Sequence, residues 1–392
     1  MRHAQTTWPE VAIEDFAEVV TGGTPSTAKS EYWKGGKIPW LNSGELNKRI
    51  ITHADNFITE DGLKNSAAQM MPEDTVLVAL TGATTGVSAL LKMSACANQS
   101  VTGILPSKRH HPHFLFHYMQ SIRHGIISDS YGGAQKHISQ AYVKQLKVPL
   151  PSVDEQARIA ILLDEADKLR KLGVQADGRT AELIPAIFNK MFGDPASGSN
   201  RWPIVSLKDM GKVTTGNTPS RNDPEHFGTF VEWIKTNNID ATHGIITTAA
   251  ERLSEKGTKV GRVVPSGTIL IICIAGSRGY LGDAAVVDRQ VAINQQINAI
   301  TPNHDVDSYF LCEMIVAMKT VIQHRATGVM TGIINKSTLE SIPMICPPFP
   351  LQKEFAQRVK EIRELEAGQA TSRARLDALF QSMLHGAFNG EL

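Results

Sequence analysis

Two stretches of the sequence decide the fold: WPEVAIEDFAEVVTGGTPS at residues 8–26 and WPIVSLKDMGKVTTGNTPS at residues 202–220. They align without a gap, and ten of their 19 positions are identical. Chance does not produce such agreement, so the second half of the chain repeats the first. Because the period is about half of the 392 residues, the repeated unit is a whole domain and not a short solenoid element.

Four later pairs of segments extend the repeat in the same order. They are IPWLNSGELN (38–47) with VEWIKTNNID (231–240), MPEDTVLVALTG (71–82) with VPSGTILIICIAG (264–276), NQSVTGILP (98–106) with NQQINAITP (294–302), and GGAQKHISQ (132–140) with GVMTGIINK (328–336). The short apolar runs TVLVAL and TILIICIA, bounded by Gly and Pro, predict buried strands. Apolar residues at three- and four-residue spacing predict helices over residues 113–122 and 307–318.

Each half ends in a short proline-rich stretch, which is followed by a helical segment of about 40 residues. Apolar side chains recur there near a 3.5-residue period, which favours a coiled-coil-like pair of helices. These side chains are Ile159, Leu162, Leu169, Leu183 and Ile187 in the first segment, and Phe355, Ile362, Leu376, Leu379 and Met383 in the second. The alternative is that each helix packs on its own domain.

We therefore expect an α+β fold with pseudo-two-fold symmetry, in which two homologous β-rich domains are separated by an antiparallel spacer of two long helices. The expected domains cover residues 1–150 and 195–350, and the spacer helices cover residues 151–194 and 351–392. At 1.5 Å per residue, about 36 helical residues would span about 54 Å.

Composition narrows the class of protein. The 40 Lys and Arg residues against 39 Asp and Glu residues exclude a histone-like polybasic protein, but not a nucleic-acid reader with a few well-placed groups. No apolar run is long enough to cross a membrane, and the first residues lack the apolar core of a secretion signal. The four cysteines lie far apart, which favours reduced thiols in a cytoplasmic protein.

Several motifs suggest chemistry that the rest of the sequence does not support. The letters DEAD at residues 164–167 match a helicase box, but the chain has no phosphate-binding GxxxxGK[ST] loop, so we expect these carboxylates on the solvated side of a helix. The histidines His110, His111, His113 and His117 have no cysteine or carboxylate at ligand spacing, so we expect a solvated loop and no metal. We expect no catalytic centre in this chain.

Two similar domains held apart by helices would form a reader of two separated DNA segments. The shared scaffold motifs contrast with divergent loops, such as GAQK at residues 133–136 against VMTG at residues 329–332. Unlike loops on a common scaffold predict two different half-targets, and therefore an asymmetric target.

The motifs TGGTPST, ALTGATTG, NQSVTGI, GGAQKHIS and VPLPSVDEQARIA resemble one target-recognition domain and connecting helix of the specificity subunit of Type I restriction–modification enzymes. TTGNTPS, NQQINAI and FPLQKEFA repeat the plan, and LDALFQSMLHGAFNGEL resembles the end common in that family. The second half departs from the pattern where GSRGY replaces GATTG and VMTG replaces GAQK. These departures leave its half-target and its contact residues less defined.

The resemblance implies a non-catalytic, sequence-specific subunit that binds double-stranded DNA. Its helices would bind two adenine-N6 methyltransferase subunits, and restriction/translocase subunits would join that core. S-adenosylmethionine, ATP and Mg would belong to those partners, with no cofactor in this chain. The alternatives are the specificity subunit of a Type IIB-like or orphan DNA-methylation complex, a self-contained nuclease or methyltransferase, and a structural dimerisation protein.

Residues in the loops are the candidates for DNA contact, because Arg and Lys pair with guanine while Asn and Gln pair with adenine. In the first domain they are Thr84, Thr85, Asn98, Gln99, Gln135, Lys136 and His137, and in the second Ser277, Arg278, Tyr280, Asn294, Gln295, Gln296 and Lys336. The pairs Asn98–Gln99 and Asn294–Gln295 recur in both halves, so they could instead satisfy buried backbone groups. The ten apolar residues of the two helical stripes are the candidates for subunit binding.

Overall fold

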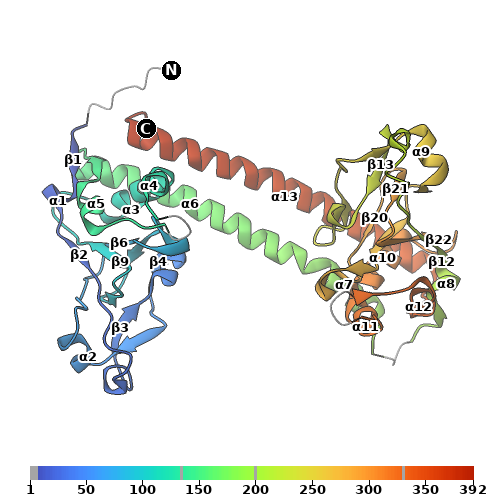
Figure 1. Cartoon of the computed structure of the whole chain (residues 1–392), viewed down its shortest axis with the longest axis horizontal. Coiled ribbons are helices and arrows are strands. Elements are labelled where there is room, and N and C mark those ends of the chain that lie inside the picture. Colours follow the sequence, from blue (N-terminus) through green and yellow to red (C-terminus); the bar gives the residue numbers. More distant parts are fainter. Residues whose placement is uncertain (1–7, 133–135, 198–200, 329–331) are drawn as a thin grey trace. The chain divides into compact units, whose positions relative to one another are not determined.

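The structure, a computed structural model, describes residues 8–132, 136–197, 201–328 and 332–392. The chain divides into two compact units, one formed by Met1–Leu172 with Arg373–Leu392 and the other by Gly173–Ser372. Figure 1 shows the strands of the first unit in blue to teal and those of the second mainly in yellow to orange. Each unit therefore combines one repeat of the sequence with a part of each long helix.

The first unit is built around a five-stranded sheet whose central strand, β6 (Val76–Ala79), is buried on both faces. Val76 and Val78 belong to the apolar cluster that includes helix α3 (Pro112–Ser121), and Leu77 and Ala79 belong to a second cluster. The TVLVAL run is thus a buried strand, as its composition predicts. The sheet order is β2 (Val19–Thr21), β9 (Val101–Ile104), β6, β7 (Ser88–Leu91), β4 (Ile50–Ile51).

Two smaller sheets complete the first unit. One has the order β5 (Asn56–Ile58), β3 (Ile38–Leu41), β8 (Cys96–Ala97), and the other pairs β1 (Glu10–Ala12) with β10 (Lys147–Pro149).

The second unit repeats this arrangement. Its main sheet has the order β12 (Gly211–Thr215), β22 (Ile297–Pro302), β18 (Ile269–Ile272), β20 (Ala284–Val286), and β18 is again buried throughout. Its second sheet has the order β16 (Arg252–Leu253), β13 (Phe227–Ile234), β21 (Val291–Ile293), β17 (Arg262–Val264). Three strand pairs remain: β14 (Ile239–Asp240) with β15 (Ile245–Ile246), β19 (Ile274–Ala275) with β23 (Gly332–Ile333), and β11 (Ile204–Ser206) with β24 (Pro343–Ile345).

The agreement between the units extends to one parallel strand pair in each. Strand β3 pairs in parallel with β8, and β13 pairs in parallel with β21. Trp40 and Trp233 hold corresponding positions in these pairs, opposite Cys96 and Ala292. The expected duplication of a whole α+β domain is therefore confirmed.

Short helices connect the strands and occur in matching places. In the first unit they are α1 (Ile13–Phe16), α2 (Glu60–Lys64), α3, α4 (Arg123–Asp129) and α5 (Gln140–Gln145). In the second they are α8 (Leu207–Met210), α9 (Glu255–Val260), α10 (Ser308–Ala317), α11 (Lys319–His324) and α12 (Lys336–Glu340). The predicted helices at 113–122 and 307–318 are confirmed as α3 and α10.

Two long helices, α6 (Val153–Ala181) and α13 (Phe349–Asn389), each contribute to both units, and α7 (Leu183–Phe192) follows α6. Figure 1 shows α6 in green and α13 in red. Within the first unit the two helices are antiparallel. Arg158 Nη2 donates to the carbonyl oxygen of Leu392 (2.7 Å), and Arg170 Nε donates to the carboxylate of Asp377 (2.6 Å).

Within the second unit, α13 contacts α7 through aromatic rings. Phe355 lies with its ring centroid 5.5 Å from that of Phe188 and 5.4 Å from that of Phe192. All three rings belong to the core that also contains Phe310 of α10. The helices therefore pack both on a domain core and on one another, so each of the two arrangements considered from the sequence holds in part.

The buried face of the helices differs by one position from the expected stripe in several turns. Leu163 and Ile184 are buried, whereas their neighbours Leu162 and Leu183 are 39% and 41% exposed. Adjacent apolar residues fit one period in two registers, and packing against the domain core selects between them. The sequence period alone therefore could not assign the seam.

A buried glutamine fastens each long helix to its domain. In α6, Gln156 Oε1 accepts from the N–H of His111 (2.7 Å), and its Nε2 donates to the carbonyl oxygen of Pro151 (2.9 Å). In α13, Gln352 repeats both bonds, to the N–H of Asp307 (3.0 Å) and the carbonyl oxygen of Pro347 (2.8 Å). This shared joint fixes the alignment of the two helices, with Gln156 equivalent to Gln352.

Charged contacts between domain and helix have opposite polarity in the two units. In the first unit, Asp167 of α6 is buried and its carboxylate lies 3.1 Å from Arg49 Nη1. In the second unit, Arg363 stands at the position in α13 that corresponds to Asp167, and its Nη2 lies 3.1 Å from Glu313 Oε1 on α10. The helix thus supplies the acid in one unit and the base in the other.

These contacts correct two expectations from the sequence. The DEAD carboxylates do not all face solvent, because Asp167 is 5% exposed and Asp164 accepts from His117 Nε2 at 2.8 Å. The histidine cluster is not a solvated loop, because His110 and His117 are buried and His117 contacts Asp164 of α6. Charged side chains count as solvated in a sequence pattern, and their partners on distant segments become visible only in the fold.

Candidate nucleic-acid interface

The candidate residues of the first unit meet where strand β6 ends. The N–H of Leu80 donates to the carbonyl oxygen of Ser100 (2.8 Å), and the carbonyl oxygen of Leu80 accepts from the N–H of Ile138 (2.9 Å). The N–H of Gly82 donates to the carbonyl oxygen of Lys136 (3.0 Å). Three segments that are distant in the sequence, around residues 82–85, 98–100 and 136–138, therefore lie together at one end of the sheet.

The same junction occurs in the second unit at the end of β18. The N–H of Cys273 donates to the carbonyl oxygen of Gln296 (2.9 Å), and the carbonyl oxygen of Cys273 accepts from the N–H of Ile334 (2.8 Å). Strand β19 then pairs with β23, which brings the loop at residues 276–280 next to the segment that begins at Gly332. Each unit therefore carries one cluster of loops built on the same backbone plan.

In the first unit, two threonines hold the loop after β6. Thr84 Oγ1 donates to the carbonyl oxygen of Thr81 (3.1 Å). Thr85 is buried, and its Oγ1 lies 2.8 Å from the carbonyl oxygens of both Gly82 and Lys136. The Thr85 side chain therefore fixes the two loop segments to each other.

The neighbouring segment presents more exposed groups. Lys136 is exposed and its Nζ donates to the carbonyl oxygen of Ile127 (3.2 Å). The half-buried His137 ring lies 3.9 Å from the ring of Tyr131, which is 56% exposed. Gln135, the remaining candidate of this loop, lies outside the described residues. A cation and an exposed aromatic ring thus border the loop after β6.

In the second unit, Ser277, Arg278 and Tyr280 are exposed on the loop that contains the short helix η6 (Arg278–Tyr280). Arg278 Nη2 donates to the carbonyl oxygen of Gly328 (2.7 Å). Gln323 Nε2 donates to the carbonyl oxygens of Arg278 and Leu281, both at 3.0 Å. The loop backbone is therefore held from α11 while its side chains face outward.

Lys336 occupies a different place from the other candidates. It begins α12, where Asn335 caps the helix, and its ammonium lies 3.5 Å from the carboxylate of Glu340. The sequence alignment paired it with Gln140, which begins α5 in the first unit. Lys336 thus belongs to a helix start next to the loop cluster.

The repeated Asn-Gln pair forms a turn that is supported by TGGTPS in the first half and by TGNTPS in the second. The Oδ1 atoms of Asn98 and Asn294 accept from the N–H two residues later, both at 3.1 Å. A side chain on Gly22 or Gly216 would collide with the carbonyl oxygens of the turn, because a Cβ would lie 2.4 Å from that of Asn98 and 2.0 Å from that of Asn294. The alternative for the repeated pairs thus holds for the two asparagines, which satisfy local backbone, but not for Gln99 and Gln295, whose bonds are to threonine side chains.

The second residue of each turn is exposed and bonded to the same motif. Thr24 Oγ1 donates to Gln99 Oε1, and Thr218 Oγ1 donates to Gln295 Oε1. Both glutamines therefore have one amide atom engaged within the protein and the rest of the amide at the surface.

A cavity of about 320 Å³ lies beside the loop cluster of the second unit. Gln296 and Tyr280 line it, as do Thr236 and Asn237, which the sequence reasoning missed. The signal was present, because Thr236 and Asn237 lie two and three residues after the Trp-containing strand that aligns between the halves. Their counterparts in the alignment are the different residues Ser43 and Gly44. Residues that differ immediately after a matching strand deserve inclusion among the candidates.

The apolar candidates on the helices fall into three groups. Ile159, Phe355 and Ile362 are buried in the domain cores. Ile187, Leu376 and Met383 are half-buried. The exposed members are Leu162, Leu169, Leu183 and Leu379, with exposed fractions of 39%, 51%, 41% and 54%.

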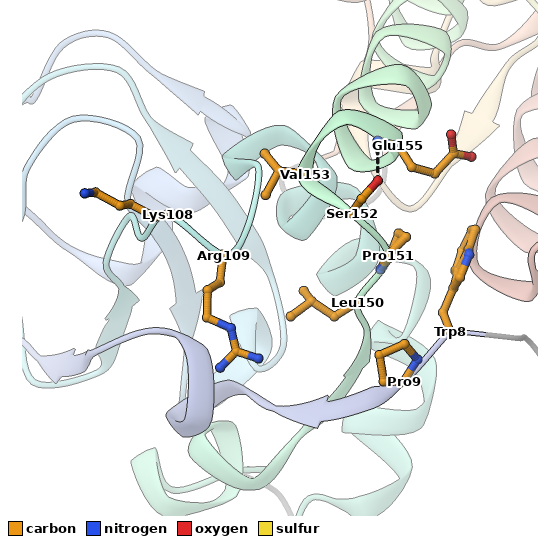
Figure 2. A pocket seen from close by; sticks show the side chains of 9 residues that line it. All are labelled: Trp8, Pro9, Lys108, Arg109, Leu150, Pro151, Ser152, Val153 and Glu155. Atoms are coloured by element: carbon orange, nitrogen blue, oxygen red, sulfur yellow. Dashed lines mark hydrogen bonds between the residues drawn. The ribbon is translucent and has the colours of Figure 1, made fainter.

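A larger hollow of about 630 Å³ lies at the start of α6 in the first unit and is lined by Trp8, Lys108, Arg109 and Glu155, among others. Figure 2 shows the side chains of Lys108 and Arg109 extending in different directions. Arg109 Nη1 donates to the carbonyl oxygen of Asp15 (2.7 Å), so its guanidinium is engaged within the domain. These two cations therefore do not converge on one ligand.

Within residues 8–132, 136–197, 201–328 and 332–392, no group of three His, Cys, Asp or Glu side chains is arranged to hold a metal ion. Cys273 lies at the loop junction, but burial raises the pKa of its thiol to about 12, so it is protonated at neutral pH. In the part of the chain that the structure describes, no helix combines the length and apolarity that a membrane crossing requires.

A sequence model of the family described as "Type I restriction modification DNA specificity domain" matches residues 5–176 and 200–372. The chain is 22% identical over 384 residues to the Type I restriction enzyme MjaIX specificity subunit of Methanocaldococcus jannaschii, covering 91% of this chain and 87% of that protein. It is 27% identical over 167 residues to the EcoR124I/EcoR124II specificity subunit of Escherichia coli, covering 41% of each chain.

Two solved structures are similar over nearly the whole chain. One is a chain from a study of complex assembly and conformational transition of the type I R-M system, with a TM-score of 0.65, 18% identity and 98% of both chains covered. The other is the Type-I restriction-modification system S subunit from M. genitalium, with a TM-score of 0.60, 14% identity, and 98% of this chain and 96% of that chain covered. At these identities the similarity is one of fold.

Proposed function

The chain belongs to the family of Type I restriction–modification DNA specificity proteins, and from that premise we propose that it reads an asymmetric, two-part target on double-stranded DNA. Each unit would read one half-target with the loops at the end of its central strand. One observation carries the proposal: both units bring three loop segments together on the same backbone plan, with different side chains on each. A common scaffold with different outward groups suits two different base sequences.

The chain would carry no catalysis of its own. It would recruit two adenine-N6 methyltransferase subunits and the restriction/translocase subunits, which would supply S-adenosylmethionine, ATP and Mg. Recruitment is supported by apolar side chains exposed at equivalent positions of the consecutive helices α6 and α7 on one side and of α13 on the other. Leu169 and Leu365 are 51% and 50% exposed, and Leu183 and Leu379 also correspond to each other. Repeated exposed leucines are suited to two copies of one partner.

The function is tested by mapping DNA methylation in cells that carry the methyltransferase subunit with and without this chain. We expect a methylated motif with two specified half-sites and an unread gap of fixed length, present only with the chain. Methylation or cleavage by the purified chain alone would contradict a recognition role. So would a set of methylated motifs that does not change when the chain is deleted.

The recruiting surface is tested separately with Leu169→Asp, which places a charge at one of these exposed leucines. We expect methyltransferase co-purification to fall at least about tenfold, since a charge would have to be desolvated in the interface. Gln175→Asp is the matched control, because it adds the same charge at another exposed position of α6. Equal binding by both variants would remove this surface from the proposal.

A further inference from the structure

The cavity beside the loop cluster of the second unit contains a side chain whose hydrogen-bonding polarity the structure fixes. Gln296 lines this cavity together with Tyr280, Thr236 and Asn237. Gln296 follows the Asn-Gln turn and is half-buried, so its amide lies at the boundary between the protein and the solvent. An amide at such a position can contact a ligand in the cavity while the surrounding protein restricts its rotation.

Two linked hydrogen bonds determine which amide atom of Gln296 is available. The backbone N–H of Gln296 donates to Asn294 (3.1 Å), so the accepting side-chain atom of Asn294 is its carbonyl oxygen. The other polar atom of Asn294 is therefore the NH2 group, which donates to Gln296 Oε1 at 3.1 Å. Asn294 is buried, and this pairing satisfies it. The atom that Gln296 has left for a ligand in the cavity is its Nε2, a hydrogen-bond donor.

The same turn in the first unit carries a different side chain at this position. The N–H of Ser100 donates to Asn98 Oδ1 at 3.1 Å, and the carbonyl oxygen of Ser100 accepts from the N–H of Leu80. Gln296 makes the equivalent two backbone bonds with Asn294 and Cys273. The scaffold thus fixes the backbone at residues 100 and 296 and leaves the side chain free to differ.

We propose that Gln296 is a base-reading residue of the second half-target, where its Nε2 donates to an acceptor atom on the edge of a base. Ser100 holds the corresponding place for the first half-target. The inference rests on the proposed function and adds to it the polarity of one contact. In the major groove the acceptors are guanine O6 and N7, adenine N7 and thymine O4, whereas cytosine offers the N4 donor. A fixed donor therefore selects an acceptor-bearing base and rejects cytosine at that position.

The test is Gln296→Glu, assayed in the complete complex with the methyltransferase subunit. The substitution keeps the shape, and one carboxylate oxygen can still accept from Asn294, but the group toward the cavity becomes an acceptor. We expect methylation of the native target to fall at least about fivefold, the smaller end of the loss typical of one base contact. Methylome mapping should show a changed or relaxed base at one position of the second half-site only.

Three further variants make the result decisive. Gln290→Glu adds the same charge at an exposed position that lines a different hollow, and it should leave the motif unchanged. Gln296→Leu removes the donor without adding charge, and it should relax the same base position. Ser100→Ala should affect the first half-site only. Thermal melting of each complex verifies folding.

The possible outcomes separate the two proposals. If the wild-type complex gives no two-part motif, the proposed function fails. If the wild type gives the motif but Gln296→Glu and Gln296→Leu both leave its rate and sequence unchanged, the base-reading role of Gln296 fails while the proposed function stands.

Discussion

Replacing Arg363 with glutamine would leave the carboxylate of Glu313 without its cation in the second unit. The two side chains are 20% and 11% exposed, and Arg363 also pairs with Glu366 at 2.9 Å. Removing one partner of such a buried pair costs about 3–5 kcal/mol, because the remaining charge is left unpaired in a poorly solvated place. Arg363→Gln should therefore destabilise the second unit by an amount of this order.

The pH dependence of this loss follows from the pKa of Glu313. Burial raises that pKa, and the nearby Arg363 opposes the rise. Without Arg363 the pKa would rise further above its unfolded value. A carboxyl group with a raised folded pKa destabilises the fold increasingly as pH rises from its unfolded pKa to its folded pKa. The deficit of Arg363→Gln relative to wild type should thus be larger near neutral pH than near about pH 5.

Hydrogen exchange measured by mass spectrometry can assign the loss to one unit. We expect amides of α10 to exchange roughly 10²- to 10⁴-fold faster in Arg363→Gln, while amides of α3 in the first unit keep their rates. Arg358→Gln is the control on the same helix, because Arg358 is 47% exposed and its pair with Glu354 contributes at most about 1 kcal/mol.

The triple variant Glu313→Gln, Arg363→Gln, Glu366→Gln removes all three charges and should recover most of the lost stability. If the triple variant were as unstable as Arg363→Gln alone, unpaired buried charge would not be the cause, and the reasoning would be refuted.

Three further predictions concern packing, backbone and titration. In denaturant titrations, Phe355→Ala should lower the free energy of unfolding by about 3–5 kcal/mol, because the ring is fully buried. Leu365→Ala, at a half-exposed position of the same helix, should change the free energy of unfolding by less than about 1 kcal/mol. Gly216→Ala should lower the melting temperature, because the added Cβ would lie 2.0 Å from a backbone oxygen. Gly173→Ala should raise the melting temperature, because its Cβ meets no atom within 4 Å and alanine has the better helix propensity. Burial lowers the pKa of His110 to about 4, so its contribution to stability is complete above its unfolded pKa of 6.5 and is lost as pH falls toward about 4. Between about pH 7 and pH 5 this loss of unfolding free energy is on the order of 2 kcal/mol. His110→Phe should therefore flatten the fall in unfolding free energy over that range.

The fold could be predicted from the sequence to the extent that the duplication preserved its motifs. The TVLVAL and TILIICIA runs predicted β6 and β18 because a strand that is buried on both faces has no polar alternation. The helical face was assigned one position away in places, as with Leu162 and Leu163, because neighbouring leucines fit the same period. Only tertiary packing distinguishes two registers that are equally apolar.

The candidate site was predicted in its loops but not in its internal bonding. Alignment of the halves identified Gln296 and Arg278, because both stand in loops between matching strands. The donor polarity of Gln296 depends on its contact with Asn294, and that arrangement requires the turn itself. The burial of Asp167 depends on Arg49, which comes from a distant loop. Sequence patterns record the groups that are available, whereas their pairing depends on long-range contacts.

The opposite polarity of the domain–helix ion pairs affects how a duplicated chain docks each β-rich domain on its own helix and not on the helix of the other repeat. If the second β-rich domain docked on α6, Glu313 would meet Asp167, and if the first docked on α13, Arg49 would meet Arg363. Both mismatched assemblies would bring like charges together in a poorly solvated contact, which opposes them. The glutamine joint is common to both helices and cannot distinguish them. These charges thus favour docking of each repeat on its own helix segment, and an exchange of the two domains within the chain should carry the matching helix residues with it.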